Sequence, residues 1–338
     1  MIAVPDFATL TAAEQEQRMR RLADRAIARW HGDWTVGRLI IHRENAVFEA
    51  KAADGRRAAL RIHRAGYHSD ASLRSELVWM ASLGDAGLQV PALIPPAGGA
   101  PFLIAAHEDV PAPRQVDLLG WLDGRPVGEV ERSRLPSIYF DAGALAAQLH
   151  GHSAAWPLPA EFVRHSWDAD GLIGPAPLWG GYAALSTLQH DERDLLDRAR
   201  SAAAPALAAI GQDGDRYGLI HADLVPENLL WDEAGLKLID FDDSGFGWHM
   251  FELATALFFH LDEPDYPAIE QALFAGYASV RPLGAAMRAQ LPLFLMLRGF
   301  TYLGWVGTRS ETETARTLTP MMIARTCGLA AAFLGERS

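Results

Sequence analysis

The segment from Tyr217 to Leu257 constrains this chain more than any other part of its sequence. It reads YGLIHADLVPENLLWDEAGLKLIDFDDSGFGWHMFELATAL, in which two short apolar runs typical of strands are joined by the turn Asp232–Gly235. Because a hairpin reverses the chain, we expect it to return Asp240, which follows the second run, toward the loop that holds Asp223 and Asn228. The sequence therefore predicts one cluster of carboxylate and amide groups.

These groups are the ones that phosphoryl transfer requires. A carboxylate must accept the proton of the attacking hydroxyl, and Asp223 suits this role. Hard oxygen ligands must hold Mg2+ against the phosphates of a nucleotide, and the amide of Asn228 and the carboxylate of Asp240 suit that second role.

The run from His221 to Asp240 resembles the catalytic and metal-binding loops of the aminoglycoside phosphotransferase, choline kinase and homoserine kinase superfamily, whose fold is similar to that of protein kinases. The resemblance implies that Asp223 is the catalytic base and that Asn228 and Asp240 bind Mg2+. It also implies that His221 supports the loop. Glu252 stands where the family usually has Asp in an Asp-Leu-Ala motif, and we expect its carboxylate to brace the catalytic loop.

The same resemblance implies an ATP site in the N-terminal part of the chain. Arg61 stands where the family has a lysine on the phosphates, and Glu76 on the next predicted helix is its expected ion-pair partner. The turn at Arg43-Glu44-Asn45-Ala46 occupies the position of the phosphate-covering loop and contains no glycine. Trp121 and Leu122 would form the hinge beside the adenine.

The chain length predicts two lobes, and hydrophobic spacing predicts an antiparallel sheet with one main helix in residues 1–121 and a mainly helical lobe in residues 122–338. The resemblance implies that this α+β arrangement is the two-lobed fold of the protein-kinase type. The helices are expected at Thr11–Trp30, which begins with a capping box, from Ser69 or Asp70 onward, around Phe140, Ala144, Leu145 and Leu149 with an end at His150-Gly151, at Asp191–Ile210 and at Leu291–Val306. The strands of the first lobe are expected at Arg38–His42, Ala46–Lys51, Arg57–His63, Pro101–Ala106 and Gln115–Leu122.

Composition limits the partners and the location of the protein. A net charge of -12 over 338 residues disfavours general binding to nucleic acid or anionic lipid, and it suits a cationic acceptor. The apolar stretch that ends at Val306 is interrupted by Pro292, Arg298 and Gly299, so we interpret it as a buried helix and not as a membrane span. One cysteine, Cys327, and an N-terminus without a secretory pattern predict a cytoplasmic protein.

For several other residues the sequence allows two different roles. Asp242 and Asp243 could contact metal or a cationic substrate, or they could simply solvate their loop. Trp248, Trp179 and His249 could line a substrate pocket, although tryptophan is more often a core residue.

The predicted activity is transfer of a phosphoryl group from ATP, with Mg2+, to a small hydroxylated molecule such as an amino alcohol, a hydroxy amino acid or an aminosugar. A protein Ser/Thr kinase and a nucleotide-binding regulator without turnover remain alternatives. The sequence gives no indication of the oligomeric state.

Overall fold

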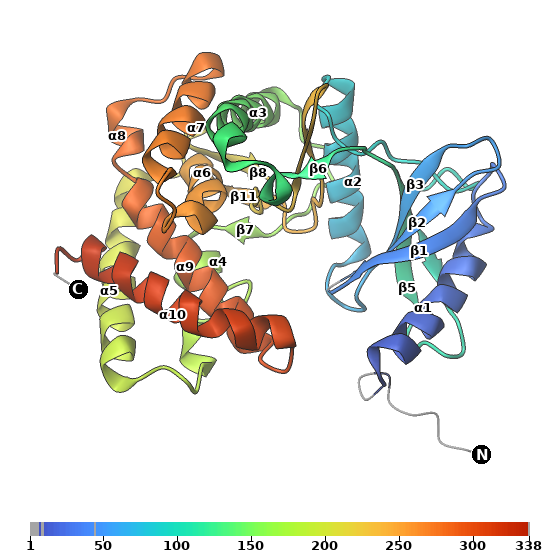
Figure 1. Cartoon of the computed structure of the whole chain (residues 1–338), viewed down its shortest axis with the longest axis horizontal. Helices are drawn as coiled ribbons and strands as arrows, with labels where there is room; N and C mark the ends of the chain where they lie inside the picture. Colours follow the sequence, from blue (N-terminus) through green and yellow to red (C-terminus); the bar gives the residue numbers. More distant parts are fainter. Residues whose placement is uncertain (1–6, 8–9, 44, 337–338) are drawn as a thin grey trace. The chain divides into compact units, whose positions relative to one another are not determined.

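Two units make up the chain in the computed structural model, which describes residues 7, 10–43 and 45–336. The N-terminal unit comprises Met1–Asp123 and Leu158–Val163, and the C-terminal unit comprises Gly124–Pro157 and Arg164–Ser338 (Figure 1). The first unit is built around one sheet and the second is mainly helical, so the predicted α+β fold is confirmed.

The sheet of the N-terminal unit has five strands in the order β1-β2-β3-β5-β4, and every neighbouring pair is antiparallel. In β2 and β3 the residues that face α1 are apolar and fully buried, among them Phe48 and Leu60. Burial of this face against α1 provides the core of the unit. The elements of this unit are α1 (Ala12–Ile27), β1 (Thr35–His42), β2 (Ala46–Lys51), β3 (Arg57–Ile62), α2 (Asp70–Asp85), β4 (Leu103–Ala105) and β5 (Arg114–Gly120).

Both helices of this unit begin where their capping residues predict. The Thr11 side chain accepts a hydrogen bond from the N–H of Glu14, and the Glu14 carboxylate accepts one from the N–H of Thr11, which completes the predicted capping box. Ser69 is the N-cap of α2, and its hydroxyl accepts from the N–H of Ser72. These caps satisfy N–H groups that have no partner within the helix.

The C-terminal unit contains two small three-stranded sheets, β10-β9-β6 and β7-β11-β8, among its helices. The antiparallel pair β9–β10 is the hairpin that the sequence predicts, with Gly235 opposite Asp232 at the turn. The elements of this unit are β6 (Arg125–Pro126), two 3-10 turns (Val127–Glu129 and Arg132–Arg134), α3 (Leu135–Ala155), β7 (Ser166–Trp167), α4 (Ala169–Ile173), a 3-10 turn (Tyr182–Ala184), α5 (His190–Ile210), β8 (Tyr217–Ile220), β9 (Leu229–Asp232), β10 (Gly235–Leu238), β11 (Gly245–Trp248), α6 (His249–Leu257), a 3-10 turn (Phe258–His260), α7 (Tyr266–Val280), α8 (Ala285–Arg288), α9 (Leu291–Thr308) and α10 (Glu313–Phe333).

Helix α3 differs from its prediction in its end and in its buried face. It continues past Gly151 to Ala155, and Phe140, which the spacing placed in the core, is 41% exposed. The face that packs on α7 is centred on Gly143, where an added Cβ would lie only 1.9 Å from the carbonyl oxygen of Leu273. The close approach of the two helices therefore selects a face that a count of large apolar residues does not identify.

Helix α9 confirms the prediction of a buried helix over the apolar stretch. Most of its residues are buried, and it packs against α10 and α6 (Figure 1). Among the described residues, none of the helices combines the length and apolar character that a membrane span requires.

Candidate active site

A buried network of charges in the N-terminal unit surrounds Arg61. This residue lies on β3 directly opposite Asp117 of β5, and its Nε and Nη2 atoms donate to the two carboxylate oxygens of Asp117 at 2.9 and 2.8 Å. Nη2 also donates to Oε1 of Glu76 at 2.9 Å, so the predicted ion pair is present. The Nε2 atom of His63 lies 2.7 Å from Oδ2 of Asp117. Arg61 is therefore held by two carboxylates.

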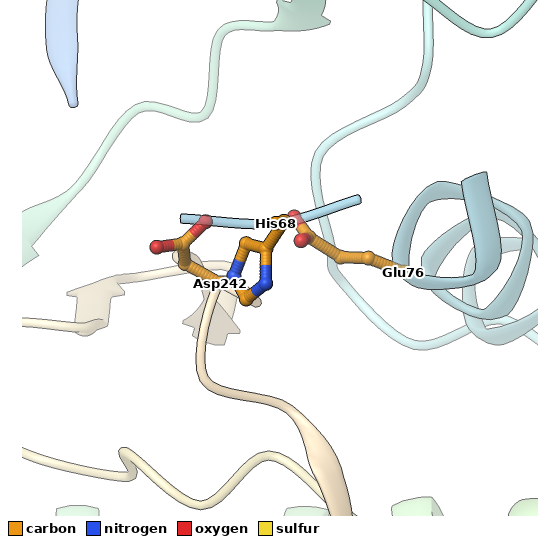
Figure 2. Close-up of side chains that lie close together, drawn as sticks. All are labelled: His68, Glu76 and Asp242. Carbon is orange, nitrogen blue, oxygen red and sulfur yellow. The ribbon is translucent and has the colours of Figure 1, made fainter. Parts of the chain in front are cut away.

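The environment of Asp117 keeps its carboxylate ionised. Burial alone would raise the pKa of this group, but the charge of Arg61 and the contact with His63 outweigh burial and lower the pKa to about 2. Glu76 projects from α2, and His68 lies on the loop that precedes this helix (Figure 2). The sequence predicted Arg61 and Glu76 but gave no reason to single out Asp117, because its proximity depends on the pairing of β3 with β5.

The remaining residues predicted for the nucleotide lie at two loops of the same unit. The side-chain oxygen of Asn45 accepts from the N–H of Arg64 at 3.2 Å, which ties the β1–β2 turn to the end of β3. Trp121 and Leu122 follow β5 and are half-buried, and the guanidinium of Arg57 lies 4.4 Å from the ring centroid of Trp121. Glu44, which belongs to the same predicted turn as Asn45, lies outside the described residues.

In the C-terminal unit, Glu252 anchors the loop that follows β8. Its carboxylate accepts from the N–H of His221 at 2.8 Å and from the N–H of Ala222 at 2.7 Å, and it is fully buried on α6. Ala222 has φ 64°, a left-handed conformation that costs energy for a residue with a Cβ. Burial raises the pKa of Glu252 to about 7, although its two backbone hydrogen bonds oppose this rise. The carboxylate therefore makes the contact with the loop that the resemblance implies.

The hairpin brings the end of β10 onto this loop. The N–H of Ile239 donates to the carbonyl oxygen of Asn228 at 3.0 Å, and Nε2 of His221 lies 3.0 Å from the carbonyl oxygen of Ile239. Nδ2 of Asn228 donates to Oδ2 of Asp223 at 2.8 Å. Asp240, the next residue after Ile239, has φ 65° and is exposed. The two loops thus lie side by side, as the hairpin argument requires.

The donor set of these loops fits a hard divalent cation. Because Nδ2 of Asn228 donates both to the side chain and to the carbonyl oxygen of Asp223, the amide oxygen of Asn228 is directed away from them. An amide oxygen and the carboxylate of Asp240 are ligand types that Mg2+ prefers.

Arg298 of α9 contacts the Asp223 carboxylate and was not predicted as a site residue. Its Nη2 atom donates to Oδ1 of Asp223 at 2.6 Å, and its Nη1 atom donates to the carbonyl oxygen of Ala222 at 3.1 Å. The side chain is fully buried, whereas that of Asp223 is 20% exposed. The available signal was a single charge within the apolar stretch of α9.

The acidic loop that follows Asp240 is held in place by hydrogen bonds from the Arg164 side chain to its backbone carbonyl groups. Arg164 donates to the carbonyl oxygens of Ser244 and Asp242, each at 2.5 Å. Asp242 is buried on this loop (Figure 2). Oδ1 of Asp243 accepts from the indole N–H of Trp179 at 3.0 Å. Burial raises the pKa of Asp243 to about 7, with a further contribution from the nearby charges of Asp223 and Asp242.

Trp248 lies in the core of the C-terminal unit. It is 2% exposed, its indole N–H donates to the carbonyl oxygen of Gly211 at 2.7 Å, and it packs against Tyr217 and Phe294. This environment is that of a structural residue, so we assign Trp248 no contact with substrate.

The fold is that of the two-lobed, protein-kinase-like phosphotransferases. The structure of a microcompartment-associated aminopropanol kinase matches with a TM-score of 0.83 and 32% sequence identity, covering 93% of this chain and 97% of that one. The structure of amicoumacin kinase hAmiN in complex with AMP-PNP, Ca2+ and Ami matches with a TM-score of 0.75 and 17% identity, covering 95% of this chain and 96% of that one. Amicoumacin kinase from Bacillus subtilis (strain 168) is 25% identical over 299 residues, which is 82% of this chain and 81% of that protein.

The family model of the phosphotransferase enzyme family matches residues 38–288, which include Arg61, Asp117, Asp223 and Asp240 but end before Arg298. The chain belongs to this family. It is a phosphotransferase, a kinase of the kind that uses an alcohol group of a small molecule as acceptor.

Proposed function

We propose that this enzyme transfers the γ-phosphoryl group of ATP, in the presence of Mg2+, to the hydroxyl group of a small amine-bearing molecule. The observation that carries the proposal is the convergence of the Asp223 loop and the β9–β10 hairpin. The side-chain amide of Asn228 donates to the Asp223 carboxylate, and the backbone carbonyl oxygen of Asn228 accepts from the N–H of Ile239. A base and a pair of oxygen ligands for a metal are thereby supplied by adjacent loops.

Asp223 is assigned to the acceptor. Its carboxylate, one-fifth exposed, would orient the acceptor hydroxyl and take its proton as the oxygen bonds to the γ-phosphorus and ADP leaves. Asn228 and Asp240 would hold Mg2+, which supplies neutralisation of the phosphate charge when bound.

Arg61 is assigned to the nucleotide phosphates in place of the lysine of the family. Two carboxylates occupy its Nε and Nη2 donors, so its orientation is fixed before nucleotide binds. A guanidinium that is already positioned loses little side-chain entropy on binding. The half-buried Trp121 and Leu122 are assigned to the adenine on the strength of the family resemblance.

An amine on the acceptor is supported by charge. The loop after Asp240 carries Asp242 and Asp243, and burial, together with the nearby charges of Asp223 and Asp242, raises the pKa of Asp243 to about 7. An ammonium group near these carboxylates would relieve their mutual repulsion. An aminopropanol kinase is also among the proteins of similar fold and sequence.

The test is a screen for ADP release from ATP and Mg2+ over aminopropanol, homoserine, hydroxylysine, choline and aminosugars, each compared with its deaminated analogue. We expect turnover with at least one amino alcohol and much less with the analogue that lacks the amine. Equal turnover with and without the amine would contradict the acceptor class while leaving the kinase activity intact.

Two further arms address the alternatives. Labelling of a peptide mixture, with no labelling of small alcohols, would indicate a protein kinase. Stabilisation of the protein by ATP and Mg2+ without ADP release from any acceptor would indicate a regulator.

A further inference from the structure

Both oxygens of the Asp223 carboxylate are held by other side chains. Nη2 of Arg298 donates to Oδ1 at 2.6 Å, and Nδ2 of Asn228 donates to Oδ2 at 2.8 Å. With one donor on each oxygen, the carboxylate plane is fixed. Each oxygen keeps a second lone pair, so the carboxylate can still accept a hydrogen bond from a substrate hydroxyl.

Arg298 also holds the backbone of the loop. Its Nη1 atom donates to the carbonyl oxygen of Ala222, the residue in left-handed conformation immediately before Asp223. One guanidinium therefore restrains both the main chain and the side chain at this point. A planar group with several donors can do this, whereas an ammonium is a compact charge.

The guanidinium is in turn fixed by an aromatic enclosure. It lies 4.4 Å from the ring centroid of Tyr302, 4.7 Å from that of Trp179 and 5.7 Å from that of Phe251, and Nη2 donates to the hydroxyl of Tyr302 at 2.9 Å. A guanidinium that lies over aromatic ring faces is stabilised by cation–π interactions, and these are stronger where water is excluded. Trp179 reaches this position because Gly304 allows close approach: a Cβ there would lie 1.9 Å from the carbonyl oxygen of Gly180.

We propose that Arg298 is a positioning residue for the base of this kinase, in that its buried guanidinium sets the orientation of the Asp223 carboxylate and the conformation of the loop at Ala222. The inference rests on the proposed role of Asp223. The hydrogen bonds of Arg298 go to Asp223, Ala222 and Tyr302, so its effect on the reaction is exerted through Asp223 and the loop that carries it.

Arg325, whose side chain is 9% exposed, offers a control for the loss of an arginine with the same kinds of partner. Arg325 of α10 donates to the carbonyl oxygen of Phe258 at 2.8 Å and to Asp262 at 2.5 Å, and its guanidinium lies 5.2 Å from the Phe258 ring. It thus has a carbonyl, a carboxylate and an aromatic partner, as Arg298 does. Its carboxylate partner belongs to no assigned site, so R325M reports the general cost of removing such a residue.

The experiment compares wild type, R298M, R298K, R325M and D223N in ADP release with aminopropanol and the other amino alcohols, together with hydrogen–deuterium exchange over residues 217–230. We expect R298M to lower kcat by about 100-fold, the size of effect that a misplacement of about 1 Å produces, while KM for ATP stays unchanged. R298K should recover part of this turnover because it retains the charge. R298M, unlike R325M, should lose protection from exchange across the loop.

The outcomes separate the inference from the proposed function. An active wild type with an equally active D223N would refute the role of Asp223. A strongly impaired D223N beside an R298M variant of normal kcat would refute the inference alone. Unchanged exchange over residues 217–230 in R298M would overturn the inference even if no acceptor is turned over, because that measurement requires none.

Discussion

Replacement of Asp117 by Asn tests how the N-terminal unit holds Arg61. The substitution preserves the shape of the side chain but removes its charge and one of the two oxygens that accept from Arg61. The NH2 group of the introduced Asn is itself a donor, so it cannot accept a hydrogen bond from Arg61. Arg61 would keep Glu76 as its remaining carboxylate partner.

The magnitude follows from the pKa of Asp117. Its value of about 2, against 3.8 for the unperturbed group, corresponds to about 2.5 kcal/mol in favour of the ionised form at about 1.4 kcal/mol per pKa unit. Because the folded-state pKa is lowered, this stabilisation is present above about pH 3.8 and is lost as the pH falls toward about 2. We therefore expect D117N to lower the free energy of unfolding by about 2–3 kcal/mol at neutral pH.

The assay is urea unfolding followed by circular dichroism, with D123N as the matched control. Asp123 also pairs with an arginine, Arg57, at 2.8 Å, but its side chain is 77% exposed. An exposed pair contributes about 0–1 kcal/mol, so D123N should be nearly neutral. D117N should also weaken the binding of ATP, because Arg61 loses the partner that fixes two of its donors. Equal stability of D117N and D123N at neutral pH would refute the reasoning.

Three further predictions concern the C-terminal unit. D223N should bind ATP normally but turn over about 100-fold more slowly, whereas D240A should lose Mg2+-dependent nucleotide binding, and equal loss of both properties in both variants would contradict the assigned roles. G143A should destabilise the protein by about 1–3 kcal/mol in urea unfolding, because its Cβ meets a carbonyl oxygen of α7 at 1.9 Å. G151A in the same helix, whose Cβ meets only the Cδ of Arg281 at 3.8 Å, should be neutral or stabilising. Burial lowers the pKa of His249 from 6.5 to about 3, so protonation opposes folding below about pH 6.5. Wild type should therefore lose about 1 kcal/mol relative to H249Q between about pH 7 and pH 5.5, and a constant difference would contradict this.

The sequence predicted those features that depend on neighbours in the chain. The capping box at Thr11, the start of α2 at Ser69 and the β9–β10 hairpin each involve residues a few positions apart. Their backbone geometry depends on local spacing, because helix caps and hairpin turns are formed by residues only a few positions apart in the sequence. The same holds for Asp223 and Asn228, which lie five residues apart and contact one another directly.

Only the tertiary structure decided which distant groups support these residues. Asp117 is 56 positions from Arg61, and Arg298 is 75 positions from Asp223. Pairing of β3 with β5 creates the first contact, and packing of α9 against the loop that carries Asp223 creates the second. Such contacts depend on how the elements pack, which no local pattern encodes. A buried charge must still find a partner, so the arginine within an apolar helix already indicated that one exists without identifying it.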